Sequence, residues 1–266
     1  RTLHSALIHN LIANKETRMT ACYFIDATEA GDVLPLAELD YVVGAEAKSD
    51  TNEPHALEVA DPQDIQAITH VLALEHREHE DHTIEEPEMY TFWRDFHPSI
   101  WPDKYLSFYA PHPITKEKRE YTLFRQETGF PLWDYRRIFD CEQFNSWVYA
   151  GDLSLMNWPQ SDYFLGNIYD VSEQDKKKHL YQAKQLSLSL FYWLQTEAPR
   201  PDGGKGYPGL KLRKDVFQTE DGLAKAAYIR ESRRIKAEYT VVEQDVSPDF
   251  NEARTGKFYE DRVGLG

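Results

Sequence analysis

The sequence predicts a mixed α/β fold, and three stretches of the chain carry that prediction. Residues 21–27 form an apolar run typical of a buried strand, and the run ends in small and acidic residues. The apolar pattern of residues 65–75 fits either a helix or a strand, and its β-branched residues favour a strand. Residues 173–197 predict a long helix, because a Ser172-x-x-Asp175 capping pattern precedes an apolar stripe of helical period.

The remaining elements are expected to be short. Polar, proline-containing residues 48–64 mark a module boundary, and the proline- and glycine-rich residues 198–210 predict a loop after the long helix. Residues 87–170 are rich in aromatic residues and prolines, so we expect irregular strands and long loops there. The other expected segments are an amphipathic element at 3–12, a helical or looped piece at 33–47, a helix from near Asp221 and a strand at 237–246.

The composition narrows the possible partners. The chain has 266 residues, 41% of them hydrophobic, which is enough for one large domain or two smaller ones. The net charge of -15 argues against nucleic acid as the main partner, because phosphate binding needs basic patches. No apolar run reaches the roughly 18 residues that span a bilayer. Two cysteines, Cys22 and Cys141, form neither a disulfide framework nor a CxxC motif.

Small and hydrogen-bonding residues follow the predicted first strand. In open α/β folds, ligands bind at the carboxyl ends of strands. Ala27 and Gly31 would let a ligand approach the backbone there, while Thr28 and the neighbouring acids could hold hydroxyl groups. A polar turn after an ordinary buried strand is the alternative. Glu29 and Asp32, three residues apart, also leave open a carboxylate-based hydrolase.

A second candidate is the run "YIRESRRI", Tyr228–Ile235. Its arginines, Arg230, Arg233 and Arg234, have the forked donors that bind carboxylates and phosphates and stack on planar rings. A salt-bridge network with Glu231 explains the same pattern, and the sequence does not decide between the two.

Four histidines are candidates for reactive groups: a set of three and the single His97. His76, His79 and His82 are spaced three apart in "HREHEDH", which would align them on a helix as metal ligands. The intervening charges are typical of a solvated face, so no metal site is assigned. His97 lies among aromatic residues and could act as an acid or base, whereas a packed loop histidine is the alternative.

Four segments together resemble the FAD-dependent oxidoreductase family related to the glutathione-reductase-type flavoproteins. They are "FIDATEAGDVLPLAELDYVVGAE", "WPQSDYFLG", "SLSLFYWLQTEAPRPDGGKGYPGL" and "AAYIRESRRIKAEYTVVEQDV". The resemblance runs from about residue 20 to the end of the chain, and the pair "IDATE.GD" and "IRESRRI" is its most specific part.

The resemblance implies FAD as the cofactor and a discontinuous Rossmann-type FAD-binding domain. Residues 1–47 would be the later part of that domain, residues 48–225 a mixed α+β substrate and connecting domain, and residues 226–266 a return toward the FAD side. The implied cofactor-binding residues are Asp26, Ala27, Thr28, Glu29, Gly31, Asp32, Arg230, Arg233 and Arg234.

The chain departs from the family pattern in two ways. Glu29 stands where the family's Ala-Thr-Gly-like turn has glycine, and the chain lacks the family's N-terminal G-x-G-x-x-G unit. We therefore expect an internal fragment that also lacks the C-terminal flavin segment.

The expected reaction is hydride transfer between a small organic substrate and the flavin. His97 and Tyr228 are candidates for catalytic roles. We expect no nucleic-acid or membrane partner, and the oligomeric state stays open. A non-redox module that binds carbohydrate or protein is the alternative from another class.

Overall fold

The chain divides into two compact units. The computed structural model describes residues 3–145 and 151–247, together with residues 250, 252 and 256. Unit 1 combines Arg1–Gln66 with Glu231–Gly266, and unit 2 is the continuous stretch Ala67–Arg230. Helices and strands occur in both units, which confirms a mixed fold of the α/β type. The functional division expected at residues 47 and 225 stays a prediction.

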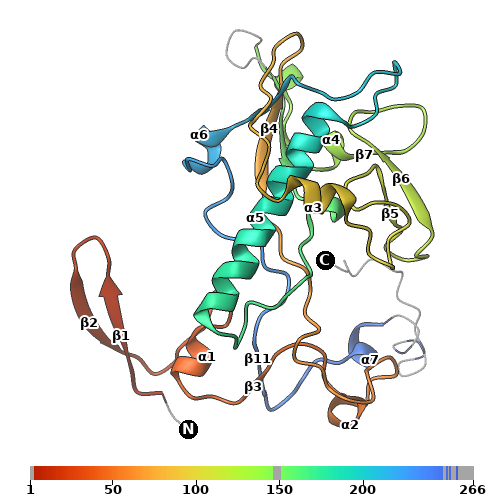
Figure 1. Cartoon of the computed structure of the whole chain (residues 1–266). Helices are drawn as coiled ribbons and strands as arrows, with labels where there is room; N and C mark the ends of the chain where they lie inside the picture. Colours follow the sequence, from red (N-terminus) through yellow and green to blue (C-terminus); the bar gives the residue numbers. More distant parts are fainter. Residues whose placement is uncertain (1–2, 146–150, 248–249, 251, 253–255, 257–266) are drawn as a thin grey trace. The chain divides into compact units, whose positions relative to one another are not determined.

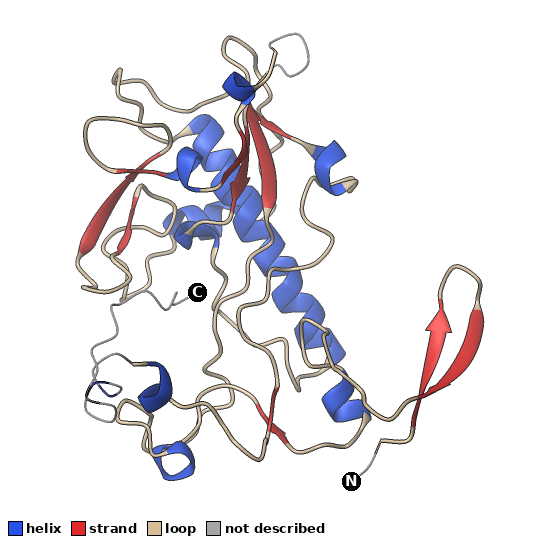
Figure 2. Cartoon of the chain, turned by 180° about the vertical axis from the view of Figure 1, so that it is seen from behind, coloured by secondary structure: helices blue, strands red, loops and turns tan. Residues whose placement is uncertain are grey.

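The core of unit 2 is a four-stranded antiparallel sheet with one long helix beside it (Figures 1 and 2). The strand order is β10 (Leu210–Leu212), β4 (Leu72–His76), β9 (Leu153–Met156) and β8 (Arg137–Phe139). The central strand β4 is buried on both faces at Leu72, Ala73 and Leu74. The strand predicted within residues 65–75 is confirmed over β4, while Ile68 and Thr69 form isolated bridges.

The long helix α5 (Glu173–Thr196) confirms the prediction from the capping pattern and the apolar period. The Asp175 N–H donates to Ser172 Oγ at 3.1 Å, which satisfies one of the free donors of the first turn. The buried residues of the helix include Ala183, Leu186, Leu190, Phe191 and Leu194. The helix ends before the predicted loop, which leads directly into β10.

A second sheet of unit 2 lies in the aromatic-rich region. Strands β5 (Tyr109–Pro111) and β6 (Lys118–Thr122) pair antiparallel, and β6 pairs parallel with β7 (Phe130–Pro131). Long loops separate these strands, as predicted for residues 87–170. The remaining helices of unit 2 are α3 (Tyr90–Asp95), α4 (Leu132–Tyr135) and α6 (Lys214–Phe217), with 3-10 turns at Cys141–Gln143 and Pro159–Ser161.

The first and last residues of unit 2 pair with each other. The Tyr228 N–H donates to the Thr69 carbonyl at 2.7 Å, and the Thr69 N–H donates back to the Tyr228 carbonyl at 3.3 Å. A further bridge joins Leu72 to Leu223. The chain therefore enters and leaves unit 2 at neighbouring points.

Unit 1 is built from short elements. An antiparallel hairpin of β1 (Ser5–Asn10) and β2 (Lys15–Thr20) extends away from the rest of the unit (Figure 1). β3 (Tyr41–Val42) pairs with β11 (Arg234–Ile235), which joins the two sequence segments of the unit. Its helices are α1 (Val33–Leu36), α2 (Lys48–Thr51) and α7 (Glu243–Val246).

Three secondary-structure predictions were wrong. Residues 21–27 form no strand, because they pair with no described strand, and their Tyr23 and Ile25 side chains are 89% and 90% exposed. No helix begins at Asp221, since its carboxylate caps the Leu223 N–H at 3.1 Å in a turn. Residues 237–246 form no strand, and helix α7 (Glu243–Val246) occupies the end of this range.

Candidate functional site

The residues after the predicted first strand form a self-contained polar turn in unit 1. Asp26 Oδ1 accepts the Thr28 N–H at 2.9 Å and the Thr28 hydroxyl at 2.7 Å, and Asp26 Oδ2 accepts the Val33 N–H at 3.1 Å. The Asp32 N–H donates to Thr28 Oγ1 at 2.8 Å. These donors, first the Thr28 N–H, lower the pKa of Asp26 below its ordinary value. Asp26 therefore shapes the turn as a carboxylate.

Gly31 lies at the point where this turn meets the arginine run. Its φ of +62° suits glycine, and a Cβ there would lie 3.0 Å from the Arg233 carbonyl oxygen. The Arg233 guanidinium donates to the Ala30 carbonyl at 2.9 Å and pairs with Asp32 at 3.3 Å. Two segments far apart in the sequence thus form one cluster, which we call the Asp26–Arg233 cluster: Asp26–Asp32 with Arg233.

Arg234 belongs to a separate ion-pair network in unit 1. Its guanidinium pairs with Glu231 and, at 3.3 Å, with Glu46, and it donates to the Gly44 carbonyl. The salt-bridge alternative weighed for the run Tyr228–Ile235 therefore describes the contacts of Arg234.

Arg230 lies in unit 2 and pairs with a half-buried carboxylate. Its guanidinium pairs with Asp162 at 2.8 Å and donates to Asn157 Oδ1, Thr69 Oγ1 and the Ala67 carbonyl. Thr69 also donates its hydroxyl to Asp162 at 2.6 Å. Burial raises the pKa of Asp162, and the neighbouring Arg230 charge opposes that rise.

Asp162 and Asn157 are the polar partners that sequence reasoning missed. Asp162 lies in the quoted segment "WPQSDYFLG", so it was within a recognised segment. Nothing in the local pattern names Arg230 as its partner, because the two residues are 68 positions apart.

The two catalytic candidates, His97 and Tyr228, are both exposed. His97 is exposed, and its Nε2 lies 3.1 Å from the Trp101 carbonyl oxygen. Tyr228 is 48% exposed, and its ring lies 5.0 Å from the Arg230 guanidinium carbon. Both residues belong to unit 2, and their catalytic roles stay predictions.

The glycine spacing G-x-G-x-x-G does occur in the chain, at Gly204, Gly206 and Gly209. It follows a helix, α5, and leads into a strand, β10, which is the reverse of the strand-to-helix setting of a dinucleotide-binding loop. A Cβ on Gly206 would lie 2.3 Å from the Gln195 carbonyl oxygen, and one on Gly209 would lie 2.2 Å from that of Arg77. Close packing within unit 2 therefore explains these two glycines.

The part of the chain that the structure describes contains no candidate metal site and no candidate membrane-spanning helix. No group of three or more His, Cys, Asp and Glu residues there could hold a metal ion. His76 ends β4, His79 has a φ of +67°, and His82 lies 2.6 Å from Glu80, so the three form no helical face. No helix among these residues is long and apolar enough to cross a membrane.

Comparison with known families decides the class of the protein. Residues 5–266 match the family described as FAD dependent oxidoreductase. The chain belongs to this family. No curated protein and no solved structure matches the chain. The oxidoreductase therefore has FAD as its cofactor and a flavin-linked redox function, which favours this class over a hydrolase or a non-redox binding module.

The Asp26–Arg233 cluster of the oxidoreductase has exposed residues and unused backbone donors. Ala27, Thr28 and Glu29 are exposed. The backbone N–H groups of Ala27, Glu29 and Ala30 donate to no other described residue, so these donors are available to phosphate or hydroxyl oxygens. The Asp26 carboxylate, by contrast, already accepts three hydrogen bonds from within the turn.

Proposed function

We propose that the oxidoreductase transfers a hydride between a small organic substrate and the flavin, with unit 1 contributing to the FAD-binding domain. The observation that carries the proposal is the Asp26–Arg233 cluster, which offers unused backbone N–H groups beside an arginine in a chain of this family. When bound, FAD supplies a ring that accepts or gives up a hydride.

The residues of the cluster would divide the work of binding. The N–H groups of Ala27, Glu29 and Ala30 would donate to FAD oxygens, and Thr28 at the exposed turn would lie near the cofactor. Asp26 would hold the turn in shape, because its oxygens already accept three hydrogen bonds. The exposed Glu29 side chain would bind hydroxyl groups rather than phosphates, which its charge repels.

The arginines would act in different places. Arg233, held by the Ala30 carbonyl and Asp32, would present positive charge toward the cofactor. Arg234 would keep the turn at Gly44 in place through its ion pairs. Arg230, paired with the half-buried Asp162, would position the substrate-facing unit 2 around Thr69 and Asn157.

The domain organisation completes the proposal. Unit 1 would be the FAD side, assembled from two sequence segments, and unit 2 the substrate side. The G-x-G-x-x-G spacing at Gly204–Gly209 lies in a helix-to-strand loop, so a segment outside these 266 residues would supply the pyrophosphate loop of a Rossmann-type domain.

Flavin spectroscopy on the natural full-length polypeptide tests this proposal. We expect a yellow protein with the visible absorption band of oxidised flavin, and loss of that band without a radical signal when an organic hydride donor is added. Arg233→Gln is expected to lower the affinity for FAD, whereas Arg125→Gln, which alters an exposed ion pair with Asp134 in unit 2, leaves the affinity unchanged. A colourless polypeptide that takes up no added FAD would overturn the proposal.

A further inference from the structure

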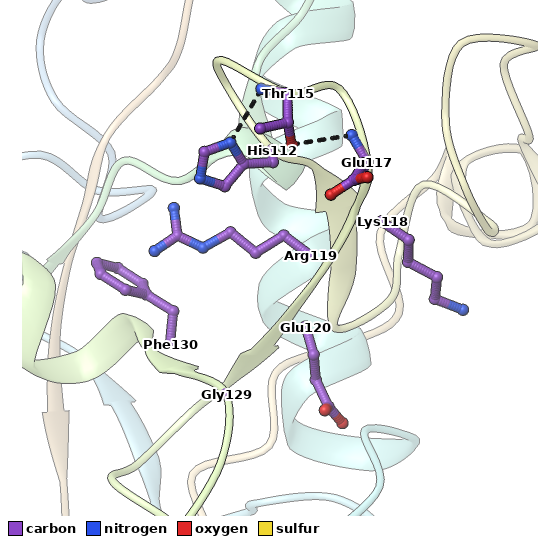
Figure 3. Close-up of a pocket in the computed structure, with 8 residues that line it drawn as sticks. All are labelled: His112, Thr115, Glu117, Lys118, Arg119, Glu120, Gly129 and Phe130. Atoms are coloured by element: carbon purple, nitrogen blue, oxygen red, sulfur yellow. Dashed lines mark hydrogen bonds between the residues drawn. The ribbon is translucent and has the colours of Figure 1, made fainter.

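A pocket of about 420 Å³ opens on the second sheet of unit 2 (Figure 3). Its volume falls in the range of pockets that bind small ligands. The residues that line it include His112, Thr115, Glu117, Arg119, Glu120 and Phe130, which come from β6, the turn before it and the start of β7. None of these residues belongs to the Asp26–Arg233 cluster.

Arg119 is the cation of this pocket that has no carboxylate partner. Its guanidinium carbon lies 4.3 Å from the centre of the Phe130 ring and 5.4 Å from that of Tyr121. No described carboxylate forms an ion pair with it. The guanidinium also forms a hydrogen bond with the Tyr121 side chain, and its other in-plane donors form the fork that can bind a carboxylate through two hydrogen bonds.

His112 adds a second donor to the same pocket. Its Nδ1 accepts the N–H groups of Thr115 at 3.1 Å and Ile114 at 3.3 Å, so in the neutral ring the proton is on Nε2. Figure 3 shows the Nε2 side of the His112 ring turned toward the Arg119 guanidinium. Two groups that can only donate thus face one region, and a shared acceptor would satisfy both.

The other charged side chains limit what that acceptor can be. Lys118 is engaged elsewhere, because its Nζ lies 3.6 Å from the centre of the Tyr109 ring and 3.8 Å from Asp103. Glu117 and Glu120 also line the pocket, and neither forms an ion pair with a described residue. Figure 3 shows the Glu120 carboxylate turned away from the Arg119 guanidinium, so Glu117 is the acid that would repel a multiply charged anion there. A carboxylate that carries a cationic group beside it would satisfy both the donors and Glu117.

We propose that this pocket binds a small zwitterion with the chemistry of a free amino acid. Its carboxylate would accept from Arg119 and His112, and its ammonium group would pair with Glu117. The proposal does not depend on flavin binding, because every residue that carries it lies within β5–β7 of unit 2 and the turns between them.

Calorimetric titration of the whole chain without added FAD tests the site, with glycine as the probe. We expect glycine to bind at least about tenfold more tightly than acetate or methylammonium, each of which has only one of the two charges. Arg119→Gln is expected to weaken glycine binding by at least about tenfold. Glu117→Gln should weaken glycine binding but not acetate binding, because the variant removes a charge that attracts the ammonium group and repels the carboxylate.

Arg125→Gln is the matched control, since this arginine of unit 2 pairs with Asp134, does not line the pocket and should leave glycine binding unchanged. Circular dichroism checks that each variant is folded. If Arg119→Gln does not fold, Arg119→Lys keeps the charge but removes the fork, and weaker glycine binding is again expected. Acetate binding as tight as glycine binding, unaltered binding by a folded Arg119 variant, or no glycine binding in the millimolar range would overturn the proposal.

Discussion

Units 1 and 2 are stabilised in different ways. Among the described residues, the buried hydrophobic side chains of unit 1 are Leu34 and Ala47, while those of unit 2 include Leu72, Trp158 and Phe191 together with more than twenty others. Unit 1 instead exposes large apolar side chains such as Ile12, which is fully exposed. Apolar burial therefore supports unit 2, whereas unit 1 depends on polar turns and ion pairs that contribute less per contact.

The largest effect that separates the units should come from two matched leucine truncations. Leu194→Ala in unit 2 removes a fully buried side chain and should lower the free energy of unfolding by about 2–5 kcal/mol. Leu36→Ala in unit 1 removes a side chain that is 84% exposed and should change it by less than about 0.5 kcal/mol. Tryptophan fluorescence during urea unfolding follows unit 2, because all six tryptophans lie in its sequence, and circular dichroism follows the whole chain. Equal effects of the two changes would contradict the comparison.

The half-buried ion pair between Arg230 and Asp162 in unit 2 should give the next largest effect. Arg230→Ala leaves the Asp162 carboxylate without its cation and should destabilise unit 2 by about 2–4 kcal/mol. The double variant with Asp162→Ala should recover part of that loss, since neither charge is then left alone. Arg125→Ala breaks an exposed ion pair and should lower stability by less than about 1 kcal/mol. A double variant no more stable than Arg230→Ala would argue against this account.

The pH dependence of the free energy of unfolding of unit 2 should reflect the titration of His70. Its ring is buried, neither ring nitrogen has a hydrogen-bond partner among the described residues, and burial lowers its pKa from 6.5 to about 4. The unfolded chain therefore binds the proton more readily between those values, so the free energy of unfolding should fall as the pH drops from 6.5 to 4. The loss should be on the order of 2–3 kcal/mol.

Urea unfolding at a series of pH values, followed by tryptophan fluorescence, measures this loss. His70→Leu removes the titrating group and should flatten the dependence within that window. An equally steep dependence in His70→Leu would assign the effect to another group.

The smallest expected effect belongs to the turn of unit 1. Asp26→Ala removes three hydrogen bonds within an exposed turn and should lower the stability of unit 1 by about 1 kcal/mol. The tryptophan transition, which reports unit 2, should not shift, whereas thermal melting followed by circular dichroism should. Glu29→Ala, whose exposed side chain makes no such bonds, is the control for stability. A shifted tryptophan transition in Asp26→Ala would show that the turn supports more than unit 1.

The long helix was predictable because its signals are local. The Ser172 cap and the apolar stripe of α5 lie within one stretch of sequence, and the helix satisfies its own backbone hydrogen bonds. The sequence could not show that residues 21–27 form no strand, because an apolar run becomes a strand only beside a partner strand. No described strand pairs with these residues, so they form no strand and most of them are exposed.

The candidate site was predictable only in part for the same reason. The sequence named Gly31, Asp32 and Arg233, and the structure brings these three together. It did not distinguish Arg230 from Arg233, although the two lie in different units, because neighbours in the chain carry no information about distant partners. The Arg230 pair with Asp162 and the pocket at Arg119 depend on such long-range contacts.

Unit 2 is a continuous insertion between the two sequence segments of unit 1, and residues near its two ends pair with each other. Thr69 and Tyr228 bond to each other within unit 2, and the Gln66 N–H donates to the Glu231 carboxylate at 3.0 Å within unit 1. Hydrogen bonds within each unit thus join the two chain segments next to the boundaries at 66–67 and 230–231. A gene segment for residues 67–230 could be cut out, expressed alone or exchanged for a related insert, and a short linker would reconnect what is left.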